Sequence, residues 1–177
     1  FWIGPIARLS QSLHCDWLNL AIGPIQNTNV RFALWTVPGQ SYYAATRRAV
    51  LAGADGVVFV ADSRREALDE NIDSMNEMLG NLRHHGLPED IPVVMQFNKQ
   101  DLPTAVKREQ LEPLMNVRGW PSFAAVANGG TGVIETASLI CQLVADRVAT
   151  EPLPSAGLEQ PHAQESGSFL ISCHRCQ

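Results

Sequence analysis

The feature that most constrains the fold is an apolar run that ends abruptly in a polar loop. Ile91–Phe97 is a mostly apolar stretch, and Asn98-Lys99-Gln100-Asp101 follows it directly. A run of this length without alternation is typical of a strand buried on both faces, as in a parallel sheet. Parallel α/β sheets bind ligands at the carboxyl ends of their strands, so the polar loop is a candidate binding site.

A second apolar run ends in a similar way. Arg31–Val37 is apolar on both alternating sets of residues and leads into Pro38-Gly39-Gln40. A glycine at a strand end lets a backbone N–H approach a terminal phosphate closely, and a glutamine after it can orient an attacking water. A plain turn is the alternative interpretation of these residues, because proline and glycine are common in turns.

Alternation of strands and helices from residue 56 onward predicts an α/β fold with a mostly parallel sheet flanked by helices. The expected strands are Asp16–Ile22, Val30–Val37, Gly56–Ala61, Ile91–Phe97 and Ser122–Val126. The expected helices are Ala44–Leu51, Glu66–Gly86, Lys107–Met115 and a last helix after Thr131. Apolar residues at steps of three and four give the two longest helices a core-facing stripe. These stripes are Leu68, Ile72, Met75, Leu79 and Leu82, and then Val133, Ala137, Ile140 with Cys141, Val144 and Val148.

Length and composition predict one domain with a tail. The chain has 177 residues, of which 45% are hydrophobic, enough to bury a sizeable core over residues 1–150. Residues 151–177 are rich in Pro, Ser, Gly and Gln and are expected to be disordered. The net charge of −5 gives no footprint for nucleic acid, and no apolar stretch reaches the ~18 residues of a membrane span. Four scattered cysteines favour free thiols in a reducing compartment, and hence the cytoplasm.

Four sequence blocks together resemble one family. They read V-R-F-A-L-W-T-V-P-G-Q, G-A-D-G-V-V-F-V-A-D-S, I-P-V-V-M-Q-F-N-K-Q-D-L-P and A-V-A-N-G-G-T-G-V. In this order and spacing they are similar to the bacterial MglA-type Ras-like GTPases, over roughly Cys15 to Val148. The resemblance implies a Ras-like P-loop GTPase fold, GTP or GDP with Mg²⁺ as ligands, and a switch function in cell polarity or motility. It also implies a Roadblock-type activating protein and downstream effectors as partners.

The resemblance assigns roles to particular residues. Asn98, Lys99 and Asp101 match the guanine-binding loop, in which the carboxylate accepts from guanine N1–H and the 2-amino group, the Lys stem covers the ring and the Asn supports the loop. The stretch Val126-Ala127-Asn128 stands where Ras-like proteins carry S-A-K, whose Ala N–H meets the guanine O6. At the phosphate end, Gln40 matches the water-orienting Gln and Gly39 the γ-phosphate contact. Ser12 falls at the position of the magnesium-binding Thr.

One family element is not found. No G-x-x-x-x-G-K-[ST] occurs among the 177 residues, so the loop that cradles the phosphates is lacking. The family carries this loop after its first strand, and the expectation is therefore a Ras-like domain whose first strand and phosphate loop are missing. Such a chain should bind GTP poorly by itself, because the β- and γ-phosphates lose their cradle.

Two hypotheses remain open from the sequence. The first is a GTPase whose N-terminal part is incomplete here. The second is a pseudo-GTPase, an interaction module that keeps the surface of the domain and no longer binds nucleotide. An in-frame phosphate loop in the upstream DNA would support the first, and a genuine start codon near Phe1 would support the second.

Overall fold

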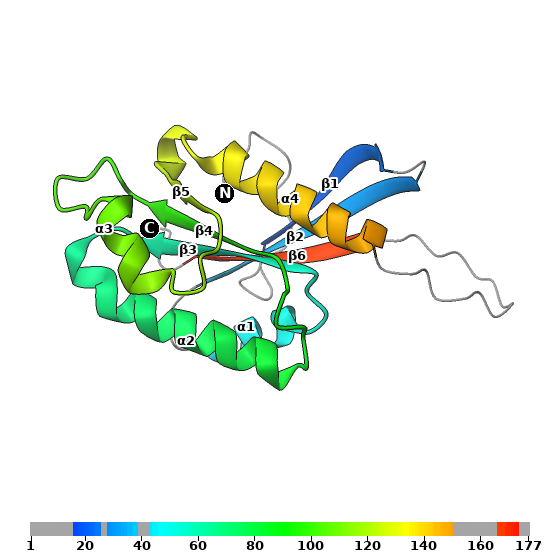
Figure 1. The fold of residues 1–177 in the computed structure, drawn as a ribbon, viewed down its shortest axis with the longest axis horizontal. Coiled ribbons are helices and arrows are strands. Elements are labelled where there is room, and N and C mark those ends of the chain that lie inside the picture. The colour runs from blue at the N-terminus through cyan, green and yellow to red at the C-terminus, as the bar shows by residue number, and fades with distance from the viewer. Residues whose placement is uncertain (1–15, 26–27, 39–42, 151–165, 174–177) are drawn as a thin grey trace, which may run out of the picture.

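Residues 16–25, 28–38, 43–150 and 166–173 are described by the structure, a computed structural model (Figure 1). Its strands are β1 (Asp16–Ile25), β2 (Thr28–Pro38), β3 (Gly56–Asp62), β4 (Val93–Asn98), β5 (Ser122–Ala124) and β6 (Ser166–Cys173). Its helices are α1 (Ala44–Leu51), α2 (Leu68–His84), α3 (Arg108–Met115) and α4 (Val133–Thr150), with short 3₁₀ turns η2 (Arg65–Ala67) and η3 (Ala127–Gly129).

The strands form one sheet in the order β1-β2-β6-β3-β4-β5. Only β1 and β2 pair in the antiparallel sense, and every other neighbouring pair is parallel. The predicted α/β fold with a mostly parallel sheet is therefore confirmed. Because β2 to β6 all run the same way, their carboxyl ends lie along one edge of the sheet, where the polar loops follow.

The C-terminal strand differs from the expected disordered tail. Ser166–Cys173 forms β6, which lies between β2 and β3 and pairs with both, shown in red in Figure 1. The physical reason is the contiguous apolar triplet Phe169-Leu170-Ile171, which the average composition of residues 151–177 conceals. The rest of that predicted tail, 151–165 and 174–177, lies outside the described residues.

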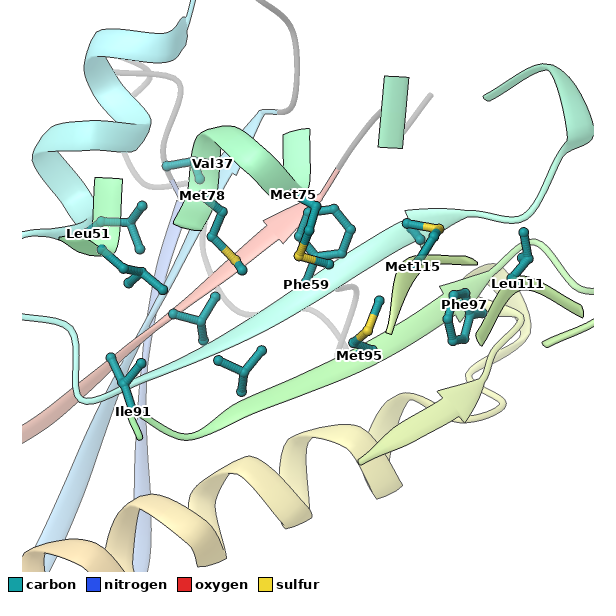
Figure 2. Close-up of a cluster of buried hydrophobic side chains, with 14 residues drawn as sticks. Val37, Leu51, Phe59, Met75, Met78, Ile91, Met95, Phe97, Leu111 and Met115 are labelled. Atoms are coloured by element: carbon teal, nitrogen blue, oxygen red, sulfur yellow. The ribbon is translucent and has the colours of Figure 1, made fainter. Parts of the chain in front are cut away.

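One face of the sheet is covered by α1, α2 and α3 (Figure 1). Figure 2 shows the core on this face, where methionine and aromatic side chains from the strands and the helices meet. Its central strand residues are Val57 and Phe59 of β3 and Met95 and Phe97 of β4, all with 1% or less of their surface exposed. Every second residue of these two adjacent strands therefore faces this core and is apolar. This is part of the reason why the two runs show no polar alternation.

The opposite face of the sheet packs against α4. Val58 and Val94 meet Ile140 and Val144 of the helix, and all four are fully buried. The helix lies so close to β3 that a Cβ added to Gly56 would be 2.6 Å from a methyl of Val144, so a larger residue there would force Val144 to shift.

The expected last-helix stripe is correct apart from its final turn. Val133, Ile140 and Val144 are buried as predicted, whereas Val148 is 46% exposed. Cys141, also on α4, is a free buried thiol, as expected, and burial raises its pKa to about 11. The helix therefore packs on the sheet from Val133 to Ala145 and leaves its end at the surface.

Element ends differ most in the first hairpin. The predicted loop Gly23–Asn29 is shorter in the structure, because Pro24 pairs with Asn29 and Ile25 with Thr28 across a bulge. Tertiary pairing overrides the local turn preference of the Gly, Pro and Asn residues in this stretch. The other predicted strands and helices agree with the structure to within about two residues at each end, as is usual for such boundaries.

Candidate functional site

The site is built where β3 and β4 end side by side. Asp62, the last residue of β3, is the register partner of Asn98, the last residue of β4. The chain after each strand then forms a loop at the same edge of the sheet, and the N–H of Ser63 donates to the Asn98 carbonyl at 3.0 Å. The two loops are thus tied together at their starting points.

Asn98 links the β4 loop to the loop after β5. Its side chain is buried, and its Oδ1 accepts a hydrogen bond of 2.9 Å from the Ala127 N–H. The structure therefore brings the predicted base loop and the predicted Ala127 position together, although they are 29 residues apart in the chain. The N–H that the resemblance assigns to guanine O6 is engaged with Asn98 here, so contact with O6 would require that this bond be shared or exchanged.

The loop after β5 is held close to the sheet by a tight return into α4. The Val126 N–H donates to the Thr131 carbonyl at 3.0 Å, and Gly132 has a φ of 74°. A Cβ on Gly132 would collide with the carbonyl oxygen of Ala124, so only glycine allows this approach. Asn128, at the tip of the loop, is exposed to solvent.

Lys99 has an unusual backbone and a fixed side chain. Its φ of 65° is the only positive φ of a non-glycine residue among the described residues. Its Nζ lies 2.9 Å from Oδ2 of Asp62, and the side chain is 22% exposed. Left-handed backbone costs energy for a residue with a side chain, and such positions cluster at functional sites. This observation supports the choice of Lys99 as a site residue.

Asp62 is the charged centre of this edge of the sheet. Its side chain is 3% exposed, and it accepts hydrogen bonds from the backbone and guanidinium of Arg64 and from Lys99. The shortest of these joins Arg64 Nη2 to Oδ2 at 2.6 Å. Burial by itself would raise the pKa of Asp62, but the hydrogen bonds from Arg64 and Lys99 outweigh it and lower the pKa from its usual 3.8 to about 2.

The side chain of Gln100 holds the loop after β4 in place through hydrogen bonds. Its Nε2 donates to the Ser63 Oγ at 2.7 Å and to the Val106 carbonyl at 2.9 Å. Gln100, the third residue of the polar loop after β4, is therefore a clamp between the loops after β3 and β4. Asp101, the next residue, is exposed.

Sequence reasoning missed Asp62, Ser63 and Arg64 as site residues. The signal was present, because the block G-A-D-G-V-V-F-V-A-D-S ends an apolar run in a carboxylate, as the neighbouring run ends in Asn98. The carboxyl ends of adjacent parallel strands meet at one edge. The remaining predicted residues Ser12, Gly39 and Gln40 lie outside the described residues.

The described residues include those predicted for the base half of a nucleotide site and not those predicted for its metal half. The predicted base half comprises the exposed carboxylate of Asp101, the Lys99 stem and Ala127. No group of three or more His, Cys, Asp or Glu side chains suited to a metal ion occurs in the part of the chain that the structure describes. Residues proposed for the metal and phosphates, such as Ser12 and Gly39, fall outside that part.

The ion pairs of Asp62 predict a pH dependence of stability. The folded pKa lies below the usual value, so the stabilising contribution is full above about pH 4 and is lost as the pH falls toward 2. A shift of this size corresponds to about 2–3 kcal/mol in the free energy of unfolding. Urea unfolding of the parent and of Asp62→Asn should therefore give stabilities that converge between pH 4.5 and 2.5. A constant difference over that range would contradict the pairing.

Comparison with known proteins bears on the whole domain. The sequence pattern described as "Arf: ADP-ribosylation factor family" matches residues 17–143. The mutual gliding-motility protein MglA of Myxococcus xanthus (strain DK1622) is 43% identical over 135 residues, which are 76% of this chain and 69% of that protein. Both matches span the base loop and the loops after β3 and β5. Among the described residues, no helix has the length and apolar character needed to cross a membrane.

Proposed function

This chain belongs to the ADP-ribosylation factor family of Ras-like GTPase domains and is of the MglA type, and from that membership we propose that it binds guanine nucleotide as a molecular switch. The proposed cycle hydrolyses GTP to GDP and controls gliding motility or cell polarity in the cytoplasm. The observation that carries the proposal is the hydrogen bond from Ala127 to Asn98, which assembles the two loops of the base site. A Roadblock-type activating protein and motility effectors are the proposed partners.

Base selection would come from Asp101. Its carboxylate is acceptor-only, so it pairs with the two donors of guanine, N1–H and the 2-amino group, whereas adenine offers neither. Asn98 contributes by holding the loop against Ala127, and Lys99 contributes the apolar stem that covers the ring. Affinity for the base would thus depend on a binding surface that is already formed in the nucleotide-free protein.

Hydrolysis would depend on residues at the other end of the site. Gln40 is proposed to orient the attacking water, Gly39 to meet the γ-phosphate through its N–H, and Ser12 to ligate Mg²⁺. The metal, when bound, neutralises charge on the β- and γ-phosphates. These three assignments rest on the family resemblance, since all three residues lie outside the described part of the chain.

Nucleotide titration separates the switch from the pseudo-GTPase alternative. We define the completed chain as this chain preceded by the N-terminal segment of the Myxococcus xanthus relative, the region in which the family carries the phosphate loop. With a fluorescent GTP analogue and Mg²⁺, the 177-residue chain should bind weakly and the completed chain at sub-micromolar concentration. The loss of the cradle explains the difference, because the base loop alone must offset an association cost of ~4–15 kcal/mol. A completed chain that folds and binds no nucleotide would favour the interaction module.

In the completed chain, Gln40→Ala should slow GTP hydrolysis and leave nucleotide affinity nearly unchanged. The side chain is proposed to act on the water, so its loss should appear in kcat alone. The matched control is Gln110→Ala, a change at an exposed position of α3. Hydrolysis at the parent rate in single-turnover assays of Gln40→Ala would remove this residue from the catalytic role.

A further inference from the structure

We propose that Asp62 and Arg64 are positioning residues that hold the Lys99 side chain in place as a ready-made cover for the guanine ring. The proposal rests on the guanine-nucleotide function given above. It adds to that function a contribution from a different strand, since Asp62 ends β3 and Arg64 follows it, whereas Lys99 follows β4. The three predicted base-loop residues, Asn98, Lys99 and Asp101, include neither of them.

The geometry fixes the Lys99 stem at both ends. Its Cα is held in the left-handed conformation at the end of β4, and its Nζ lies 2.9 Å from Asp62 Oδ2 at the end of β3. The methylenes between them must therefore cross the edge of the sheet from one strand end to the next. A free lysine loses much rotamer freedom when a ligand immobilises it, whereas a tethered one has already lost it.

Arg64 keeps the carboxylate in the orientation that Lys99 needs. Its backbone N–H and Nε donate to Oδ1, and its Nε and Nη2 donate to Oδ2, so Arg64 engages both carboxylate oxygens. Lys99 donates to Oδ2 as well, at 2.9 Å. Because Asp62 is 3% exposed, water cannot easily replace either partner.

The backbone strain at Lys99 is an independent sign that its position matters. The loop maintains the φ of 65° with hydrogen bonds on both sides, from the Gln100 N–H to the Ala125 carbonyl and from the Leu102 N–H to the Lys99 carbonyl. The Gln100 side chain adds its clamp to Ser63. A loop that needed Lys99 only as a solvated surface residue would gain nothing from holding it in this conformation.

Amine modification of the 177-residue chain tests the tether without nucleotide. The sequence contains two lysines, so exposed Lys107 is an internal reference for Lys99 in the same molecule. Under limiting acetylation read by mass spectrometry, Lys99 should react more slowly than Lys107, since it must first leave Asp62. Asp62→Asn should raise the Lys99 rate severalfold and leave Lys107 unchanged. Glu77→Gln, which breaks the distant 2.7 Å pair with Arg47, should change neither rate.

A second variant keeps the test decisive if Asp62→Asn does not fold. Arg64 is 27% exposed at its side chain, so Arg64→Ala should retain the fold and give a smaller rise in the Lys99 rate. Equal Lys99 and Lys107 rates in the parent, or an unchanged Lys99 rate in the variant that folds, would overturn the proposal.

Nucleotide binding by the completed chain tests the consequence for the site. Asp62→Asn should weaken GDP and inosine diphosphate by the same factor, about threefold to tenfold, because the stem covers any purine. In a Lys99→Met background Asp62→Asn should have no further effect, since Asp62 acts through the lysine. Additive losses, or a loss that depends on the base, would refute the positioning role. A parent that binds no nucleotide would instead refute the proposed function, and the modification rates would still decide the tether.

Discussion

Leu170→Pro should lower the free energy of unfolding by about 2–4 kcal/mol, which is a large part of the stability of a domain of this size. Leu170 lies in the middle of β6 and is the register partner of Trp35 on β2 and of Val57 on β3. A proline there removes a ladder hydrogen bond, and its ring clashes within a central strand. In the described sheet β6 alone joins the β1-β2 hairpin to β3-β4-β5, so the damage should affect both halves.

Urea denaturation of the parent, of Leu170→Pro and of Leu170→Ile measures this effect. Isoleucine has the same number of carbon atoms and keeps its N–H, so it controls for the loss of the leucine side chain. Hydrogen exchange should also show faster exchange over β2 and β3 in the proline variant, because both strands lose part of their pairing partner. If the proline and isoleucine variants are equally stable, β6 does not occupy the centre of the sheet.

The central strands could be predicted because the residues that make each one buried are adjacent in the sequence. Gly56–Ala61 and Ile91–Phe97 were expected as strands, and β3 and β4 lie within a residue or two of those bounds. Both are covered by helices on both faces, so every residue before the site is apolar or small except the buried Gln96 of β4. The first hairpin was less well predicted, since the extension of its strands depends on cross-strand pairs and not on local preferences.

The position of β6 could not be predicted from local sequence. A short apolar triplet is ambiguous by itself, and its strand character comes from two partners far away in the chain, around Leu34 and Val58. Composition averaged over residues 151–177 pointed to a segment with little to bury. β6 can be predicted only when it is known that β2 and β3 do not pair with each other and that another strand lies between them.

The candidate site shows the same division between local and distant information. The loop Asn98–Asp101 was predicted because a strand end and its motif are adjacent in sequence. The ion pair of Lys99 with Asp62 joins residues 37 positions apart, and only the register of β3 against β4 places them together. Positioning contacts of this kind are set by the sheet, so a motif search finds the residues that meet a ligand and misses those that hold them.

Asp101→Asn, in the completed chain, should shift base preference from guanine toward xanthine. Aspartate accepts from the N1–H and the 2-amino group, whereas asparagine offers one acceptor and one donor. Xanthine has a carbonyl where guanine has the amino group and therefore matches the altered pattern. Loss of one partner of a charged hydrogen-bonded pair costs about 1.5–3 kcal/mol, so GTP affinity should fall by about one to two decades.

Competition between GTP and XTP for the parent and the variant measures the shift. Asp73→Asn, at an exposed position of α2, changes the net charge by the same amount but away from the site. It should leave the preference for guanine over xanthine unchanged. The Asn98–Ala127 bond and the Lys99–Asp62 pair do not involve Asp101, so the loop should keep its shape and the change should be confined to the base edge. If guanine preference survives in Asp101→Asn, this loop does not read the base, and the switch function loses the residue on which its specificity depends.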